Sequence, residues 1–253
     1  MMWQATQSLR RKIRSAAHRR GWDIVKLRPS FGKDVPVLDF IIGDLVRRNI
    51  TGPIVQVGAN DGVMDDPIQT LIRRFDLPAL LIEPQPDVFN RLSKNYADKP
   101  NVHCVNCAIH PKAQSIKLWR VDPKIADLPE TPDFVSGLAS FNREGVINYL
   151  PDELDESCLV QVEVPCSRLK PLVEQHLSAK PLMLQVDTEG FDAEVIKLAA
   201  EENCLYPLVR YEIKHLSYAD QRDCRKLLED RGYCFLDEQF DLTAVHASLI
   251  ESP

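Results

Sequence analysis

The feature that most constrains the fold is an alternation of short apolar segments with helical patterns in the first half of the chain. Ile54–Val57, Ala79–Ile82 and Val102–Val105 are short and largely apolar, as expected for buried strands. Helical patterns over Pro67–Phe75 and Asp87–Tyr96 separate them. Strand, helix, strand, helix, strand is typical of parallel βαβ units, which wind right-handed and gather ligand sites at the carboxyl ends of their strands.

The second half of the chain returns to this order after a less regular middle. Residues 122–158 are rich in Pro, Asp and Glu, and long irregular segments in compact domains are usually functional. We therefore interpret this stretch, residues 122–158, as an insertion that covers a functional site. The other expected elements are strands over Ser115–Val121, Leu159–Val164, Leu182–Val186 and Leu208–Ile213, helices over Leu169–Leu177, Ala193–Ala200 and Tyr218–Asp230, and an edge hairpin of Tyr233–Leu236 with Leu242–Val245.

With 253 residues the chain is long enough for one sizeable domain and short for two. Its composition, 44% hydrophobic and 27% charged, is ordinary for a soluble globular protein. No apolar run approaches the roughly 20 residues that cross a bilayer. We expect an extension over residues 1–50, made of a basic helix, a linker and a helix over Val37–Asn49, and an α/β domain over residues 51–253.

The formal charge of -6 is divided unevenly along the chain. Residues 1–20 hold six Lys and Arg side chains and no acid, so the remaining 233 residues carry 25 basic and 37 acidic side chains. A body with a net charge of -12 is a poor general binder of nucleic acid, and we expect no such partner. The basic segment has three open interpretations: a helix that docks on the domain or on a second copy of the chain, a peripheral contact with an anionic membrane, or a transit peptide.

The seven cysteines indicate a reducing compartment. An odd number, scattered through a chain with no secretory signal region, is typical of free thiols. We therefore predict a cytoplasmic protein, free or at the inner face of a membrane. Cys104 and Cys107 form a CxxC pair, but no second pair follows and the surrounding run is apolar. We interpret both as buried small hydrophobic residues.

A glycine-containing turn, Val57–Gly62, follows the first expected strand. It lacks the Lys-Ser/Thr of a P-loop, and its G-x-x-x-G spacing differs from the G-x-G-x-x-G of dinucleotide sites. Asp61, Asp65 and Asp66 crowd the turn and would repel a pyrophosphate. Glu83 ends the second strand, where an acid can accept hydrogen bonds from both ribose hydroxyls. S-adenosylmethionine (SAM), which has a ribose and a cationic end but no phosphate, fits these observations.

Four segments together resemble the FkbM-type SAM-dependent methyltransferases, over about residues 50–216. The segments are Val57–Gly62 with Asp66-Pro67, Leu81–Pro86 with Phe89, Leu92 and Asn95-Tyr96, Leu184–Asp192, and Pro207–Glu212. Gln185 stands where the family commonly has Lys, and Asp192 where it commonly has Glu. The resemblance implies a class I methyltransferase fold, α/β and Rossmann-like, with a seven-stranded mostly parallel sheet, an antiparallel last strand and helices on both faces.

Two sets of site residues follow from the resemblance and from position at strand ends. The adenine is expected near Cys107 and Ala108. The catalytic candidates, one of which would take a proton from an acceptor hydroxyl, are Asp187, Glu189, Glu212 and His215, with His110 as a further candidate base. The cofactor-binding set is Gly58, Ala59, Asn60, Asp61, Gly62, Glu83, Pro84, Cys107, Ala108 and Asp187.

We predict no metal site, although Asp187, Glu189 and Asp192 together offer the oxygen ligands that Mg²⁺ prefers. Asp192 is better explained as an N-cap for the helix that follows it. Asp187 and Glu189 are two residues apart, and Gly190 supplies the backbone freedom that would let their side chains converge.

The predicted function is O-methylation of a hydroxyl group on a glycan or a secondary metabolite. Ser140, Asn142 and Arg143 of the irregular segment are the expected acceptor contacts. The partners are a small-molecule or glycan acceptor and a second copy of the chain. Two alternatives stay open: an NAD-type oxidoreductase, which the acidic turn disfavours, and a non-catalytic protein that uses the same fold for binding.

Overall fold

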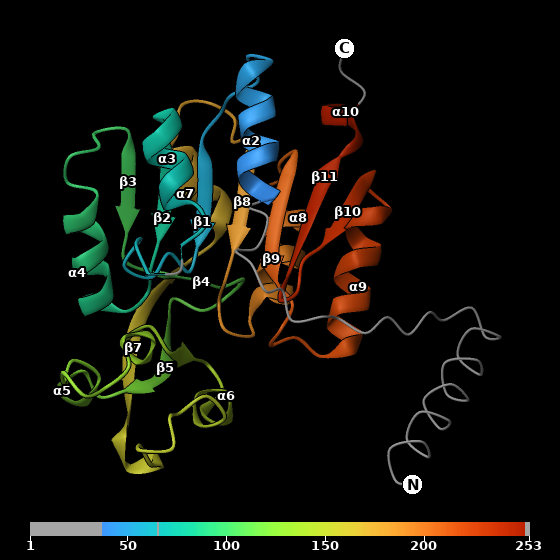
Figure 1. Cartoon of the computed structure of the whole chain (residues 1–253). Helices are drawn as coiled ribbons and strands as arrows, with labels where there is room; N and C mark the ends of the chain where they lie inside the picture. Colours follow the sequence, from blue (N-terminus) through green and yellow to red (C-terminus); the bar gives the residue numbers. More distant parts are fainter. Residues whose placement is uncertain (1–36, 65, 251–253) are drawn as a thin grey trace, which may run out of the picture. The chain divides into compact units, whose positions relative to one another are not determined.

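A seven-stranded sheet forms the centre of the fold, with the strand order β10-β11-β9-β8-β1-β2-β3 (Figure 1). Parallel pairing joins β9, β8, β1, β2 and β3, whereas β11 runs antiparallel to both of its neighbours. The predicted sheet, mostly parallel with an antiparallel last strand, is confirmed. Its strands are β1 Ile54–Val57, β2 Ala79–Ile82, β3 Val102–Val105, β8 Met183–Val186, β9 Leu208–Glu212, β10 Tyr233–Asp237 and β11 Asp241–His246.

The computed structural model describes residues 37–64 and 66–250. The predicted basic helix, the linker and Asp65 lie outside the described residues, and the boundary predicted at residue 50 stays a prediction. Among the described residues, no helix is both long and apolar enough to cross a membrane. The helices that pack on the sheet or follow its last strand are α2 Val37–Arg47, α3 Gln69–Phe75, α4 Pro86–Asn95, α7 Leu169–His176, α8 Asp192–Glu201, α9 Tyr218–Glu229 and α10 Ala247–Ile250.

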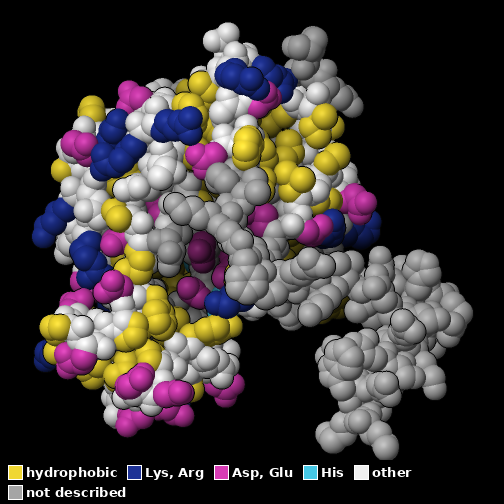
Figure 2. Space-filling model, viewed as in Figure 1, with side chains coloured by type: hydrophobic (Ala, Val, Ile, Leu, Met, Phe, Trp, Pro, Cys, Tyr) yellow, Lys and Arg dark blue, Asp and Glu magenta, His cyan; other side chains and the backbone are white. Residues whose placement is uncertain are grey.

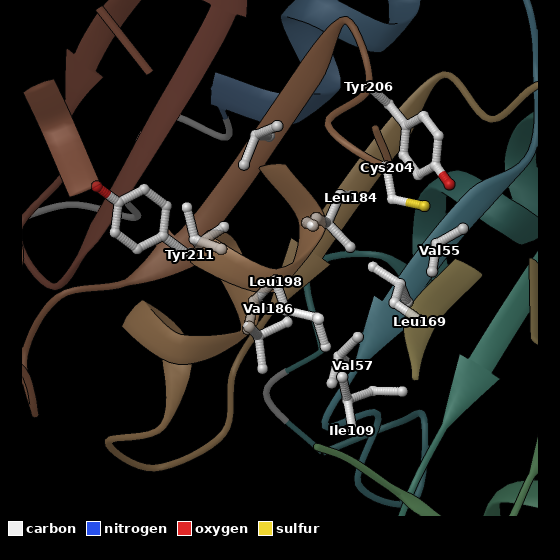
Figure 3. Close-up of a cluster of buried hydrophobic side chains, with 14 of the residues drawn as sticks. Val55, Val57, Ile109, Leu169, Leu184, Val186, Leu198, Cys204, Tyr206 and Tyr211 are labelled. Atoms are coloured by element: carbon white, nitrogen blue, oxygen red, sulfur yellow. The ribbon is translucent and has the colours of Figure 1, made fainter. Parts of the chain in front are cut away.

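Two hydrophobic clusters, one on each face of the sheet, hold these helices in place. Because successive side chains of a strand point to opposite faces, Val55 and Val57 enter one cluster with α7, α8 and α9, part of which Figure 3 shows. Ile54 enters the other cluster with α2, α3 and α4. Helices therefore cover both faces, as predicted.

The helix α2 belongs to the second cluster through Leu38, Ile42 and Leu45, whose spacing places them on one side of the helix. It ends two residues before the predicted boundary, and Asn49 then adopts a left-handed φ of 58°. The same cluster contains the first residues of β1, β2, β8 and β9, so α2 packs near the amino-terminal ends of these strands.

A second, smaller sheet with the order β4-β7-β5-β6 lies beyond the carboxyl ends of the main strands (Figure 1). The strand predicted over Ser115–Val121 is confirmed, and the one predicted over Leu159–Val164 extends to Ser167. The irregular segment has a small core of its own. Elements here are β4 Ala108–Ile109, β5 Ser115–Val121, α5 Pro123–Ala126, η1 Asp133–Ser136, β6 Ala139–Ser140, α6 Arg143–Ile147, η2 Glu156–Cys158 and β7 Leu159–Ser167.

Gly62 allows the turn after β1 to pack against α4. Its φ is 71°, and a Cβ at this position would lie 2.6 Å from both Leu92 Cδ1 and Tyr96 Cε2. Any other residue here would have a strained backbone and a Cβ atom that overlaps Leu92 and Tyr96. This glycine is therefore required for packing within the chain.

We predict that Gly62→Ala lowers the free energy of unfolding by about 2 kcal/mol, because the left-handed backbone is strained for alanine and the core has no room for a methyl group. Urea denaturation followed by circular dichroism measures this change. The matched control is Gly43→Ala in α2, where the nearest contact for a Cβ is Phe75 Cζ at 3.8 Å. The control should gain about 0.5–1 kcal/mol, since glycine is a poor helix former. Equal effects of the two substitutions would contradict this account.

Candidate functional site

Two pockets adjoin at the carboxyl ends of the main strands. The first, about 540 Å³ including its opening to solvent, lies between the ends of β1 and β2, the segment after β3 and the second sheet. The second, about 1310 Å³ by the same measure, lies over the ends of β1, β8 and β9. Gly58, Gly137, Asp187 and Glu189 line both pockets. Figure 2 shows acidic side chains gathered in the hollow between the main sheet and the smaller one.

The first pocket has a largely apolar wall and an acidic base. Phe141 from the insertion and Phe191 from the turn before α8 are in contact, with ring centroids 4.4 Å apart. Glu83 and Asp187 supply carboxylates on the side of the main sheet. The apolar residues of the lining are Val57, Ile82, Pro84, Cys107, Ala108, Ile109, Leu118, Ala139, Phe141 and Phe191.

Glu83 is held at the end of β2 by the backbone on either side of it. One carboxylate oxygen accepts a hydrogen bond from Asn60 N at 3.0 Å, and the other accepts one from Gln85 N at 2.9 Å. Burial raises the pKa of Glu83 to about 7, although both hydrogen bonds act to lower it. Each oxygen retains a free lone pair, so the carboxylate can also accept hydroxyl hydrogen bonds from the pocket.

The ends of β1 and β8 approach each other at Gly58. Asp187 N donates to Val57 O at 2.9 Å, and a Cβ on Gly58 would lie 1.6 Å from Asp187 O. Only glycine fits there. The contact brings Asp187 to the boundary between the two pockets.

Eight of the ten predicted cofactor residues line a pocket, and two do not. Asp61 turns back on its own loop, where Oδ1 accepts hydrogen bonds from Val63 N and Met64 N, both at 2.9 Å. Gly62 packs on α4. In the first pocket are Gly58, Glu83, Pro84, Cys107, Ala108 and Asp187, and in the second are Gly58, Ala59, Asn60 and Asp187.

A row of polar side chains, which we call the polar ladder, crosses the main sheet beneath the second pocket. Gln56, Gln185, Arg210 and Thr243 occupy paired positions on β1, β8, β9 and β11, and all four are buried. Arg210 donates to Gln185 Oε1 at 3.4 Å. It also forms ion pairs with Glu238 and Asp241 at 3.2 and 2.7 Å.

Sequence reasoning missed the polar ladder. It named Asp66 in the acidic turn but not as a site residue, and this carboxylate accepts hydrogen bonds from Ile68 N and Gln56 Nε2. The signal was present. Gln56, Gln185 and Arg210 each interrupt a short strand that is otherwise largely apolar. A buried polar residue in such a strand requires a partner, and three in matching positions indicate a shared polar surface.

The four predicted catalytic residues come together at the ends of β8 and β9. His215 Nε2 lies 3.0 Å from Glu189 Oε2 and 3.4 Å from Glu212 Oε2. Asp187 lines both pockets beside them. The sharp turn that Gly190 was expected to provide involves two residues, since Glu189 and Gly190 have φ values of 53° and 103°.

Burial and like charges raise the pKa values of two of these residues, Glu212 and Asp187. Burial is the largest cause for Glu212, and Asp187 and Glu189 add to it, so its pKa rises to about 9. Asp187 is surrounded by protein on most sides, although water reaches its carboxylate through the pockets. Desolvation raises its pKa well above the usual value, and the charges of Asp192 and Glu189 add to this effect. Burial and crowding therefore disfavour the ionised forms of Glu212 and Asp187.

Asp192 has a structural role, but a different one from that predicted. It is the first residue of α8 and Phe191 is the N-cap, so the predicted N-cap position is wrong by one residue. Its Oδ2 accepts hydrogen bonds from Thr188 Oγ1 at 2.9 Å and from Gly190 N at 3.4 Å. It lines neither pocket. Among the described residues, the group that could hold a metal ion is Glu189, Glu212 and His215, without Asp192.

The other predicted contacts are distributed over the insertion and its neighbours. Ser140 lines the first pocket and donates to Glu189 O at 3.2 Å. Asn142 caps α6, and Arg143 forms an ion pair with Glu156 at 2.7 Å. His110, the further candidate base, accepts a hydrogen bond from Ala113 N through Nδ1 and so stabilises a turn.

All seven cysteines are free thiols. Burial raises the pKa of Cys104 to about 11 and that of Cys107 to about 12. A thiol that stays protonated is a poor nucleophile and a poor metal ligand. The interpretation as buried small hydrophobic residues fits Cys107, whereas Cys104 is only partly buried.

Similar solved structures include several methyltransferases. An FkbM methyltransferase from Methylobacillus flagellatus KT is 13% identical, with a TM-score of 0.43, over 77% of this chain and 43% of that one. The precorrin-6y C5,15-methyltransferase of Geobacter metallireducens GS-15 is 11% identical, with a TM-score of 0.40, over 88% and 92%. The fibrillarin pre-rRNA processing protein of Methanococcus jannaschii is 9% identical, with a TM-score of 0.38, over 77% and 65%.

The chain thus spans less than two thirds of the fibrillarin protein and less than half of the Methylobacillus protein. A comparison with curated protein sequences gives no match. The family model described as the methyltransferase FkbM domain matches residues 56–235, well over half of the chain. With this match, and with pockets at the carboxyl ends of a sheet of the predicted order, the chain belongs to the FkbM methyltransferase family.

Proposed function

We propose that this methyltransferase uses SAM to methylate a hydroxyl group on a polyhydroxylated acceptor, a glycan or a secondary metabolite. The observation that carries the proposal is that two pockets of different character meet at Asp187 and Glu189. One pocket suits the cofactor that the family implies, and the other suits a polar acceptor. Their shared boundary is where a methyl group would pass from one to the other.

The residues of the first pocket fit SAM. Glu83 offers its carboxylate to ribose hydroxyls, and the apolar wall that includes Ile109 and Phe141 suits a flat adenine ring. Asp187 and Glu189 place negative charge where the cationic end of the cofactor would lie. When bound, SAM supplies a methyl group activated by a positively charged sulfur.

The second pocket fits an acceptor with several hydroxyl groups. Its lining combines amide, carboxylate and cationic side chains, which can donate or accept hydrogen bonds with a polyol. Phe134 from the insertion and Phe240 from the β10–β11 hairpin add apolar surface. The polar residues of the lining are Gln56, Asn60, Asp66, Gln185, Asp187, Glu189, Arg210, Glu212, Lys214 and Asp241.

The acidic cluster would take up the proton that the acceptor hydroxyl loses. Glu189 and Glu212 line the acceptor pocket, and His215 lies within 3.4 Å of both. A hydroxyl group needs a base at or near the transition state, and orientation beside the methyl donor supplies much of the rate.

A cytoplasmic location, membrane contact through residues 1–20 and self-association remain proposals.

Calorimetry with SAM, S-adenosylhomocysteine and NAD tests the cofactor, and transfer of a labelled methyl group to a set of polyols and glycans tests the reaction. We expect binding of the first two ligands and transfer to oxygen. Binding of NAD instead would favour an oxidoreductase. Binding of SAM with no transfer to any acceptor would favour a protein that only binds.

We predict that Asp187→Ala lowers methyl transfer by about a hundredfold or more while the protein still folds. The carboxylate lies at the boundary of the pockets, and its removal relieves repulsion from Asp192 and Glu189, so the free energy of unfolding should not fall. Steady-state kinetics and urea denaturation check the two parts. The control is Glu194→Gln on the exposed side of α8, which should be normal in both. Normal turnover by folded Asp187→Ala would reject the assignment.

We predict that SAM binding tightens several-fold between about pH 6 and about pH 8 through Glu83, whose pKa is about 7 in the free protein. Ribose hydroxyls that donate to the carboxylate favour its ionised form and lower its pKa in the complex. Affinity therefore rises with pH until the free carboxyl group is ionised.

Calorimetry across this pH range, on the wild type and on Glu83→Gln, isolates the effect, because other titrating groups are common to both proteins. The variant should bind more weakly at pH 8 and lose most of the pH dependence. An equal rise of affinity in both proteins would exclude Glu83 as its source.

A further inference from the structure

Three side chains from separate segments point their polar atoms at one small space. Glu189 comes from the turn after β8, Glu212 ends β9, and His215 follows in the loop before α9. One oxygen or nitrogen atom of each lies within 4.8 Å of the others. The closest approaches are those of His215 Nε2 to Glu189 Oε2 at 3.0 Å and to Glu212 Oε2 at 3.4 Å.

Hydrogen bonding does not account for this arrangement. His215 Nε2 and Glu212 Oε2 are both buried and have no hydrogen-bond partner, so the ring nitrogen is close to the carboxylates but misaligned with them. The His215 side chain is 9% exposed and that of Glu212 is 12% exposed. Polar atoms at such depth are nearly always paired in native proteins, and one ligand placed between these two would satisfy both.

The charge around the cluster is also unbalanced. Asp187 adds a third carboxylate beside Glu189 and Glu212. Of the cations that line the same pocket, Arg210 already forms ion pairs with Glu238 and Asp241. The Lys214 ammonium group lies over the Tyr149 ring, 4.5 Å from its centre, and its charge does not offset the effect of burial and of the neighbouring carboxylates on the pKa of Glu212. A cation placed among the three side chains would meet both requirements, charge and coordination.

The separations match those between neighbouring ligands of a small divalent ion. Ligand atoms about 2.1 Å from a metal are about 3.0 Å apart at right angles and about 3.4 Å apart at tetrahedral angles. The shorter approach, 3.0 Å, corresponds to the first value and the longer, 3.4 Å, to the second. Tyr149 packs edge-on against the imidazole, with ring centroids 4.3 Å apart, and so restricts its orientation.

We propose that Glu189, Glu212 and His215 bind a divalent transition-metal ion through Oε2, Oε2 and Nε2. One imidazole with two carboxylates suits Mn²⁺, Fe²⁺ or Zn²⁺, because nitrogen is a poor ligand for Ca²⁺ and Mg²⁺, which take oxygen. The prediction of no metal site is thereby replaced. Three protein ligands leave coordination positions on the ion open. Because Glu189 and Glu212 border the proposed acceptor pocket, an acceptor could occupy one of these positions.

Binding of the ion is independent of the proposed reaction, whereas its use there rests on the proposed function. A metal-bound hydroxyl group ionises more readily than a free one. The ion would then prepare the acceptor oxygen, and the carboxylates would hold the ion in place of acting as free bases.

Mn²⁺ is the probe for this site, because the exposed thiol of Cys234 would compete for Zn²⁺. Full-length protein treated with a chelator and then dialysed is titrated with Mn²⁺ in the absence of SAM and acceptor, and the sharp EPR signal of free Mn²⁺ reports the unbound ion. We expect one tight site per chain and a rise in melting temperature on binding.

Glu189→Gln, Glu212→Gln and His215→Gln should each weaken Mn²⁺ binding about tenfold or more. Of the three substitutions, Glu189→Gln should disturb folding least, because the Glu189 side chain is 36% exposed. The control is His246→Gln, a histidine at the far end of β11 that bonds to Ser248, and it should bind Mn²⁺ normally. Absence of a tight site in the wild type, or unchanged binding in folded Glu189→Gln, overturns the proposal. Failure of methyl transfer with every acceptor would reject the proposed function and leave this result standing.

Discussion

The contact between the ends of β1 and β8 sets the position of everything else in the site. A backbone hydrogen bond joins Asp187 N to Val57 O. Gly58 lies so close to Asp187 O that this position has no room for a Cβ atom. The two strands then diverge into different loops. The space on one side of the contact is the first pocket, and the space on the other is the second.

Burial and like charge together give the site its chemical character. Glu83, Glu212 and Asp187 all have raised pKa values, with desolvation as the largest cause in each. The apolar core that Figure 3 shows in part includes Ile82, Val186 and Tyr211, the residues that directly precede these carboxylates, and it lowers the polarity on that side of them. Cationic ligands therefore gain most at this end of the sheet, whether the ligand is a sulfonium or a metal ion.

Much of the fold could be predicted from the sequence, because buried parallel strands are short apolar runs with sharp ends. The predicted bounds of β1, β2 and β3 agree with the structure to the residue. The helix predicted from Pro67 starts two residues later, since the Asp66 carboxylate holds Ile68 N in a turn. The insertion was the least predictable part, because short strands such as β6 have no periodic pattern of their own.

The site was predicted in part, for a physical reason. Residues at strand ends, such as Glu83, Asp187 and Glu212, follow from topology alone, because parallel strands end at one edge. The direction in which a loop side chain turns depends on local contacts. Asp61 therefore faces its own backbone, and His110 stabilises a turn, although both have suitable chemistry. The polar ladder was missed because pairing between strands is not visible along the chain.

The polar ladder makes strand register a determinant of chemistry as well as of fold. In β1, Gln56 faces the second pocket, and its neighbours Val55 and Val57 belong to the core on the opposite side of the sheet. A slip of one residue would exchange these roles, placing an amide in the core and a valine in the pocket. The same holds for Gln185 in β8 and Arg210 in β9. A one-residue insertion or deletion within these strands would thus remove the polar lining of the pocket and the stability of the core together, so this lining can change only by substitution.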